Sequence, residues 1–155
     1  PGAVLWLQSG AGLSLDEVAH GLEHEAGLLG LSGTSGDLRV VLAARDDGDE
    51  RAGLAVDVLL HRLRAAIAAM VAALDGLDVL VFTGGIGEHL APVREGAAAG
   101  LAHLGVAVDP TANRAAVGVE GDITAVGATV HTLVITSRED LEIARQVRAT
   151  LADQG

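Results

Sequence analysis

The chain has 155 residues, 50% of them hydrophobic and none of them cysteine, and its length is typical of one compact domain. The absence of cysteine excludes disulfide scaffolds, cysteine nucleophiles and thiolate metal sites. The chain has ten arginines, no lysine and 21 Asp and Glu residues, so its formal net charge is −11. This excess of acid disfavours nucleic-acid and anionic-membrane partners, and the lack of lysine excludes a P-loop or Schiff-base lysine.

The sequence has no visible signal for export or membrane insertion. No basic segment followed by an apolar one occurs near Pro1, so no signal peptide is predicted and a cytoplasmic location is expected. The longest apolar stretch, Leu54 to Leu74, is interrupted by Asp57 and Arg64 and is not expected to cross a membrane. The chain opens on proline rather than methionine, which suggests a processed chain or the ordered part of something longer.

Helical patterns dominate the first half of the sequence. Ser14 and Glu17 have the spacing of a capping box, so a helix is predicted from about Ser14 to Ala26. Two glycines are expected to end this helix, and residues 31–36 are expected to form a small-residue loop. Apolar residues then recur at helical spacing from Val56 to Leu74. They predict a long amphipathic helix that begins at the acidic turn 46–50, on the order of 37 Å at 1.5 Å per residue.

The second half alternates strand and helix patterns, which indicates an α/β fold with a sheet covered by helices. The run Val79 to Phe82 is continuously apolar, as is typical of a strand buried on both faces. Ser137 is the predicted N-cap of the final helix. The predicted elements are strands at 79–82, 106–108 and 129–135, helices at 92–103 and 137–151, and an irregular segment at 111–128.

A glycine-rich turn follows the first predicted strand. The segment Thr83-Gly84-Gly85-Ile86-Gly87 places bare backbone N–H groups at a strand end beside a helix N-terminus, where anions bind. Glycine lets a phosphate or a nucleoside approach the backbone, and it adopts the positive φ that such turns use. The alternative is a tight turn without a ligand, which is the commoner meaning of an isolated GxG. The spacing does not complete GxGxxG, and the segment is no Walker motif.

An acid and a base lie two residues apart after a flexible Ser-Gly-Thr-Ser-Gly loop. Arg39 can lie along a nucleobase or pair with a phosphate, and Asp37 can bind a ribose hydroxyl. The alternative makes Asp37 a helix N-cap and Arg39 a surface charge.

Carboxylates and histidines supply the candidate metal ligands. Glu139 and Asp140, in the first turn of the final helix, can hold a hydrated Mg²⁺, or they can simply complement the helix dipole. His20 and His24 share one helical face, as a two-histidine metal site requires, but the glutamates around them indicate an ordinary polar face.

Three segments, taken in order, resemble the carboxyl-terminal half of acetate kinases. They are Gly27 to Arg39 (GLLGLSGTSGDLR), Val81 to Glu88 (VFTGGIGE) and Val134 to Ala144 (VITSREDLEIA). The resemblance runs over nearly the whole chain, and Pro1-Gly2 resembles the end of the family's Asp-Pro-Gly segment.

The resemblance implies an α/β fold, namely an actin-like ATPase domain of the acetate and sugar kinase superfamily with a mixed sheet flanked by helices. It also implies reversible phosphoryl transfer between ATP and acetate to form acetyl phosphate, with ATP or ADP and Mg²⁺ as cofactors. Glu139 would hold the Mg²⁺ side. The family has Asn where this chain has His89 and Arg138, and both residues can add positive charge near the phosphates. By residue match, the nucleotide would contact Asp37, Leu38, Arg39, Gly84, Gly85, Ile86, Gly87, Glu88 and His89.

The resemblance covers one of the family's two halves. Residues 1–155 are therefore expected to form a single carboxyl-terminal nucleotide-binding domain with no catalytic residue of its own. The amino-terminal half, which supplies an Asn-rich phosphate strand, a catalytic His and two Arg residues, is absent. Because phosphoryl transfer needs charge neutralisation from both sides of the cleft, the chain alone is expected to be inactive.

The resemblance further implies a homodimer built on this domain and a small carboxylate as the second substrate. Two alternatives stay open. One is a propionate kinase, because the family builds the acyl pocket mostly from the missing half. The other is a non-catalytic actin-like module that binds a nucleotide or mediates association.

Overall fold

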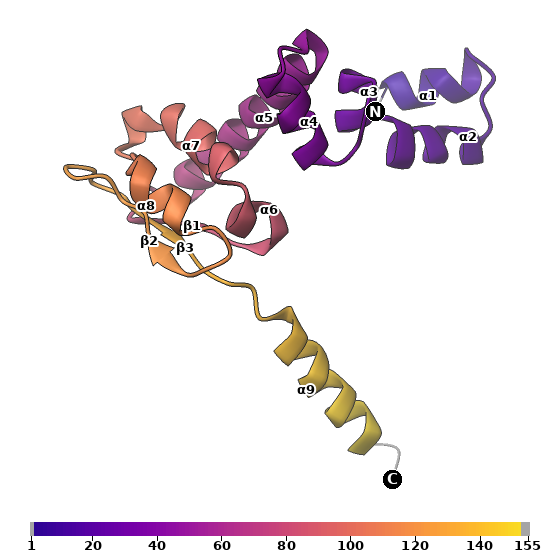
Figure 1. Cartoon of the computed structure of the whole chain (residues 1–155). Helices are drawn as coiled ribbons and strands as arrows, with labels where there is room; N and C mark the ends of the chain where they lie inside the picture. The colour runs from indigo at the N-terminus through magenta and orange to yellow at the C-terminus, as the bar shows by residue number, and fades with distance from the viewer. Residues whose placement is uncertain (1, 153–155) are drawn as a thin grey trace. The chain divides into compact units, whose positions relative to one another are not determined.

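The structure is a computed structural model, and it describes residues 2–152. The chain forms two compact units, Pro1–Leu63 and Arg64–Gly155, where its length predicts one. The long helix α5 (Glu50–Leu74) crosses the boundary between them. In the described residues the first unit has helices as its only regular elements, whereas the second holds a sheet (Figure 1).

The first unit consists of short helices and the beginning of α5. Ser14 caps α2 as predicted: its Oγ accepts a hydrogen bond from the Glu17 N–H at 3.2 Å, and Glu17 Oε2 accepts one from the Ser14 N–H at 2.8 Å. The predicted helix to Ala26 is divided, with a π-helix following His20. The elements are α1 (Gly2–Ser9), α2 (Leu15–His20), the π-helix η1 (Gly21–Glu25), α3 (Gly27–Ser32) and α4 (Leu38–Asp46).

The loop prediction for residues 31–36 begins too early, because α3 continues to Ser32. Gly30 lies inside this helix, where glycine costs about 1 kcal/mol relative to alanine. The leucines around it are partly buried, and their packing outweighs the low helix propensity of glycine. The helix ends at Gly33, whose φ of 71° gives the left-handed C-cap that favours glycine.

The helix α5 is the long helix that the apolar spacing predicts, with 25 residues. Asp49 Oδ1 caps its start by accepting hydrogen bonds from the N–H groups of Arg51 (2.8 Å) and Ala52 (3.0 Å). Within residues 2–152, no helix is both long enough and apolar enough to cross a bilayer.

The second unit is built on a three-stranded mixed sheet, as predicted from the resemblance. The strand β1 (Val79–Phe82) pairs in parallel with β3 (His131–Val134), and β3 pairs antiparallel with β2 (Gly121–Asp122), which gives the order β1-β3-β2. The remaining elements of this unit are α6 (Gly84–His89), α7 (Ala91–Ala99), the 3₁₀ helix η2 (Ala102–Leu104), α8 (Pro110–Ala115) and α9 (Glu139–Ala152).

Only one face of β1 is buried. Phe82 is buried, whereas the side chains of Val79 and Val81 are 46% and 42% exposed. The prediction of a strand buried on both faces is therefore wrong for β1, because the described part of the chain leaves the side of Val79 and Val81 to solvent. The core of the unit is a cluster of buried residues from α7, from the segment that follows α7 and from the residue before β3: Ala98, Leu101, Val106 and Val130.

Three other predictions in this unit need correction. The residues 106–108 make only isolated bridges, Val106 with Val130 and Val108 with Thr124. The segment 111–128 is not irregular throughout, because Asp109 Oδ1 caps α8 and β2 follows. The final helix begins at Glu139 rather than at Ser137, and no residue within Glu139–Ala152 is buried.

Candidate functional site

The loop before α4 is fixed by the chain's own hydrogen bonds. Ser32 is buried, its Oγ donates to the Ser35 carbonyl (3.1 Å), and the Ser35 Oγ accepts from the Asp37 N–H (3.0 Å). On the other side, Arg51 Nε donates to the Leu31 carbonyl at 3.2 Å. These contacts place Asp37 in a defined orientation at the start of α4.

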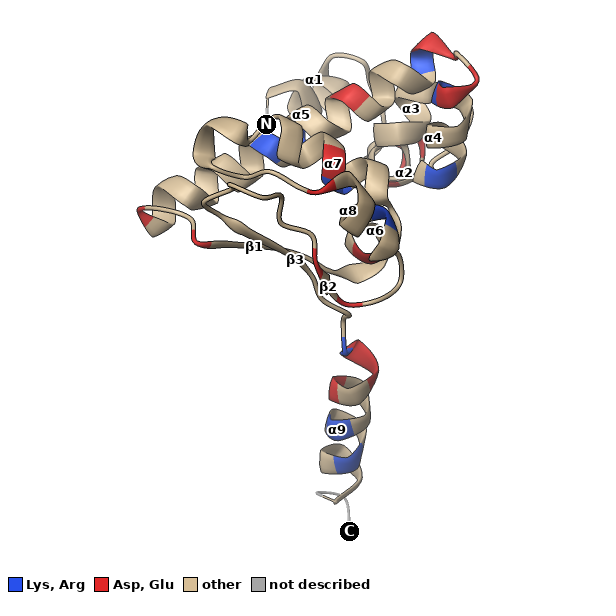
Figure 2. Ribbon diagram, turned by 60° about the vertical axis from the view of Figure 1, so that its left-hand side comes forward, with Lys and Arg blue, Asp and Glu red and all other residues tan. Residues whose placement is uncertain are grey.

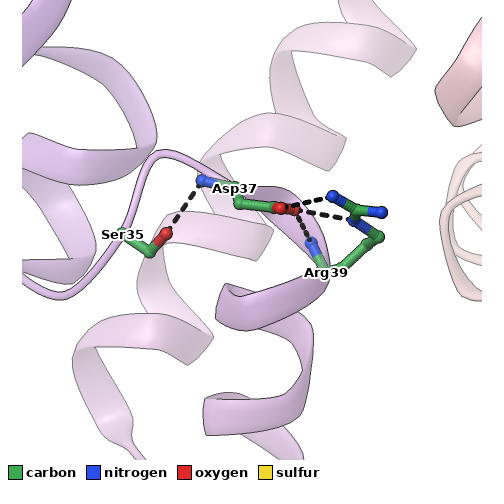
Figure 3. A network of polar contacts seen from close by, with 3 residues as sticks. All are labelled: Ser35, Asp37 and Arg39. Carbon is green, nitrogen blue, oxygen red and sulfur yellow. Dashed lines mark hydrogen bonds and ion pairs between the residues drawn. The ribbon is translucent and has the colours of Figure 1, made fainter.

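Asp37 is the N-cap of α4 and also holds the side chain of Arg39 (Figure 3). Its Oδ1 accepts from the Arg39 N–H (2.9 Å) and from Nε (3.1 Å), and its Oδ2 accepts from Nη2 (2.6 Å). The N-cap interpretation is confirmed, yet Arg39 is more than a free surface charge. Its side chain is 77% exposed, and the two-point contact with Asp37 orients its guanidinium.

The ion pair with Arg39 keeps Asp37 ionised to lower pH than an ordinary aspartate. Hydrogen bonds from the Arg39 guanidinium, and then from the Arg39 N–H, lower the pKa of Asp37 from 3.8 to about 2. The predicted contact residue Leu38 lies between them in sequence, but its side chain is buried in the first unit. Only the backbone of Leu38 is therefore free to face a ligand.

The three glycines of the turn after β1 differ in whether the structure requires glycine at their positions. Gly84 has a φ of 71°. A Cβ on Gly87 would lie 3.1 Å from the carbonyl carbon of Phe82, so Gly87 lets α6 approach β1 closely. Gly85 has neither constraint: its φ is not positive, and the described part of the chain has no atom within 4 Å of the position of its Cβ. The positive φ that the sequence predicts for this turn therefore occurs at Gly84 and not at Gly85.

The turn is itself the short helix α6, and its two sides differ in exposure. Gly85 and Ile86 face solvent, whereas Gly87 and Glu88 are buried. Thr83, the N-cap, makes no side-chain capping hydrogen bond within the described residues. The N–H groups of Gly85 and Ile86 belong to the first helical turn and so have no acceptor inside the helix. These are the bare N–H groups that the sequence predicts.

Glu88, predicted to line the nucleotide pocket, has a carboxylate that is already engaged. Its Oε1 accepts hydrogen bonds from the N–H of Gly84 (2.8 Å) and from the N–H of Ser137 (2.8 Å). The Gly84 N–H is therefore not bare. Because Ser137 precedes Glu139 by two residues, this carboxylate connects the glycine turn with the segment that carries the predicted metal residue.

A buried arginine, which the sequence analysis did not predict as a site residue, donates hydrogen bonds to the backbone of the turn. Arg94 is 0% exposed, and its Nη1 donates to the carbonyls of Gly87 (2.7 Å) and Glu88 (2.9 Å). Its Nε and Nη2 donate to the side-chain and main-chain oxygens of Asn113 at 2.7 and 2.6 Å. Burial lowers the pKa of Arg94. The spacing offered a signal, because Arg94 precedes the core residues Ala97 and Ala98 by one helical turn.

His89 and Glu139 lie at the solvent side of the second unit. His89 Nδ1 lies 3.1 Å from the Gly85 carbonyl, and because a carbonyl only accepts, Nδ1 carries the proton in this contact. Glu139 is exposed in the first turn of α9. Acidic residues gather in that turn and basic ones farther along, so the charge pattern also complements the helix dipole (Figure 2).

No preformed metal cage is present in residues 2–152, where no three His, Asp or Glu side chains are arranged to hold an ion. This finding includes His20 and His24, whose rings lie 5.0 Å apart and whose neighbours are Glu25 and Glu23. An exposed carboxylate such as Glu139 fits Mg²⁺ better than most ions, because Mg²⁺ keeps several waters and binds through one or two carboxylates plus substrate phosphates.

The predicted site residues fall into two groups. Asp37, Leu38 and Arg39 belong to the first unit, and the turn Gly84–His89 and Glu139 belong to the second. Within the second unit, the Glu88 carboxylate brings the turn and the Ser137 backbone into direct contact.

The fold is that of the actin-like ATPases. It is similar to the crystal structure of the Porphyromonas gingivalis acetate kinase, with a TM-score of 0.86 and 33% identity over 97% of this chain and 38% of that one. It is also similar to a propionate kinase from Francisella tularensis, with a TM-score of 0.84 and 33% identity over 93% of this chain and 36% of that one.

Residues 1–145 match the model of the Acetokinase family, and the chain belongs to this family. The acetate kinase of Gloeobacter violaceus is 47% identical over 146 residues, which are 94% of this chain and 36% of that protein. The chain thus spans little more than a third of the length of the relatives it matches.

Proposed function

We propose that the chain is the nucleotide-binding carboxyl-terminal part of a kinase that transfers a phosphoryl group between ATP and acetate to form acetyl phosphate. The observation that carries the proposal is Gly85. Neither its backbone conformation nor any neighbour within the described residues requires glycine there, and the space beside it is open. A glycine of that kind is explained by a ligand that approaches the backbone closely.

The remaining site residues have consistent roles in this proposal. The exposed N–H groups of Gly85 and Ile86 would donate to the nucleotide phosphates, with His89 beside them. Arg39, oriented by Asp37, would lie against the adenosine. Glu139 would hold Mg²⁺ through its hydration shell, and bound Mg²⁺ would neutralise phosphate charge. The net charge of −11 is then tolerable, because neutral N–H dipoles and a metal bind the phosphates.

Two variants with a matched control test the role of Gly85. Gly85→Val and Gly85→Ala place a side chain in the proposed path of the nucleotide, and we expect them to weaken MgADP binding at least tenfold, about 1.4 kcal/mol. Gly2→Val is the control, because the described residues place no atom within 4 Å of the position of a Gly2 Cβ and its φ is not positive. Calorimetric titration of the folded variants decides: if Gly85→Val binds MgADP as the parent does, the turn is not the nucleotide site.

We infer that catalysis needs the part of the family's length that this chain does not span. The resemblance assigns the catalytic His and two Arg residues to that part, and half of a cleft cannot neutralise the transferring phosphoryl group. The purified 155-residue chain should therefore give negligible acetate-dependent ADP formation. Hydroxamate trapping of acetyl phosphate at rates typical of a kinase would contradict this inference.

A propionate kinase is the second candidate. The solved propionate kinase and the solved acetate kinase are both 33% identical to this chain, so the similarity favours neither substrate. Assays of a protein that carries both halves, with acetate and propionate compared by kcat/KM, would distinguish the two.

A further inference from the structure

The Glu88 carboxylate joins two segments that are 49 residues apart in sequence. One oxygen, Oε1, accepts both the Gly84 N–H and the Ser137 N–H at 2.8 Å. The first donor opens the glycine turn, and the second lies in the segment that leads into α9. A carboxylate that accepts backbone N–H groups forms charge-assisted hydrogen bonds, which are stronger than neutral ones.

Glu88 is itself held firmly, so it can act as a fixed point. Its carbonyl oxygen accepts hydrogen bonds from Arg94 Nη1 (2.9 Å) and from the Gly118 N–H (3.0 Å). Arg94 is buried and also bonded to Asn113, and Asn113 Nδ2 donates to the Ala91 carbonyl at 3.0 Å. The main chain of Glu88 is thus fixed to α7 and α8, and its side chain reaches forward to the turn and to Ser137.

The position of Ser137 limits the position of Glu139. Two residues of chain extend at most about 7 Å, so fixing the Ser137 backbone restricts where the Glu139 carboxylate can lie relative to the turn. Within Glu139–Ala152 no residue is buried, so packing of α9 supplies little restraint of its own. The hydrogen bond from Ser137 to Glu88 supplies a restraint, and it lies two residues beyond the bond from the Ile135 N–H to the Phe82 carbonyl (3.0 Å).

We propose that Glu88 is a positioning residue that sets the glycine turn and Glu139 in one geometry, so that one bound nucleotide reaches the turn and its metal reaches Glu139. This inference rests on the proposed function of the site. In this role Glu88 does not contact the nucleotide, in contrast to the pocket-lining role that the resemblance implies. Through this positioning, Glu88 would increase the amount by which Mg²⁺ strengthens the binding of ADP.

The test compares Glu88→Ala, Glu88→Gln and the control Glu95→Ala, an exposed glutamate of α7, in the full 155-residue chain. Two quantities are measured: hydrogen exchange of the Ser137 amide, and the ratio of the dissociation constants for ADP without and with Mg²⁺. In Glu88→Ala we expect at least tenfold faster exchange at Ser137 and a ratio that falls towards one. Glu88→Gln should recover part of both, because its amide oxygen still accepts. Glu95→Ala should match the parent.

A second variant changes the donor of the same hydrogen bond, Ser137, in place of the acceptor Glu88. Ser137→Pro removes the donor N–H while leaving the carboxylate in place, and it should lower the same ratio even if Glu88→Ala fails to fold. A merely structural role would instead weaken ADP and MgADP binding together and leave the ratio unchanged.

The outcomes separate this inference from the proposed function. If the parent binds ADP and the ratio is unchanged in Glu88→Ala, or in Ser137→Pro where Glu88→Ala does not fold, the positioning role is wrong and the nucleotide site stands. Unchanged exchange at Ser137 in folded Glu88→Ala likewise overturns the positioning role. If the parent binds no ADP under any condition, the proposed function is wrong and the positioning role fails with it.

Discussion

Asp37 holds the guanidinium of Arg39 at two points, Nε to Oδ1 at 3.1 Å and Nη2 to Oδ2 at 2.6 Å, while the same Oδ1 caps α4. The Asp37 carboxylate thus caps the first turn of α4 and also orients the Arg39 guanidinium, which is proposed to contact the nucleotide. The two functions can be separated by mutation, because Asn retains an oxygen for the cap but loses the charge that attracts Arg39.

Asp37→Asn should reduce stability at neutral pH and change its pH dependence. The folded-state pKa of Asp37 is lowered to about 2, so its stabilising contribution is present above the unfolded value of 3.8 and is lost as the pH falls from about 4 to about 2. The difference in unfolding midpoint between parent and Asp37→Asn should therefore shrink over that range. Denaturant titrations followed by circular dichroism at several pH values measure it. The control is Asp47→Asn, an exposed aspartate at the other end of α4, and a difference that stays constant down to pH 2 contradicts the prediction.

Alanine at two neighbouring glycines should have opposite effects on stability. Gly87→Ala places a Cβ 3.1 Å from the Phe82 backbone, and we expect a loss of about 1–3 kcal/mol, as for an overpacked core. Gly85→Ala meets no atom of residues 2–152 within 4 Å, and replacing this glycine of α6 should gain up to about 1 kcal/mol. Unfolding titrations of the two variants give the comparison, and equal destabilisation would show that Gly85 is needed for the fold rather than for a ligand.

Glu139→Gln should weaken binding of MgADP while leaving binding of free ADP as in the parent. The substitution removes the carboxylate proposed to hold the metal's hydration shell and leaves the N–H groups of the turn intact. Asp140→Asn is the matched control, because it removes an equal charge from the same helical turn and so reproduces the loss of dipole compensation. Calorimetry with and without Mg²⁺ would reject the assignment if both variants lose affinity equally.

Trp6 should report the homodimer that the family resemblance implies. It is the chain's only tryptophan, and it lies exposed on α1 beside the exposed Leu5. Within Gly2–Ser9 no residue is buried, so this apolar surface is available for a second copy. Fluorescence emission should shift to shorter wavelength as concentration rises, in step with dimer formation in sedimentation. Sedimentation as a monomer at high micromolar concentration would count against a dimer.

Features encoded by local sequence were predictable, and those that depend on distant contacts were not. The capping box of Ser14, the long helix α5 and the N-cap role of Asp37 depend on residues two to four positions apart. The Glu88 contact crosses 49 residues, and Arg94 bonds to Asn113 across 19. Burial of an arginine also runs against the usual distribution of residue types, so composition gave no reason to expect it.

The exposed face of β1 has a consequence for the solubility of the chain. Val79 to Phe82 is uncharged, apolar and rich in residues with high β-propensity, and β1 lies at an edge of the sheet order β1-β3-β2. Within the described residues, one side of this strand has no hydrogen-bonding neighbour and one face is open to water. Strands of this kind pair with other chains and promote aggregation unless a charge, a proline or a covering segment protects them. The substitution Val81→Arg places a charge on this exposed face. It should therefore raise the solubility limit of the isolated chain without disturbing the pairing of β1 with β3.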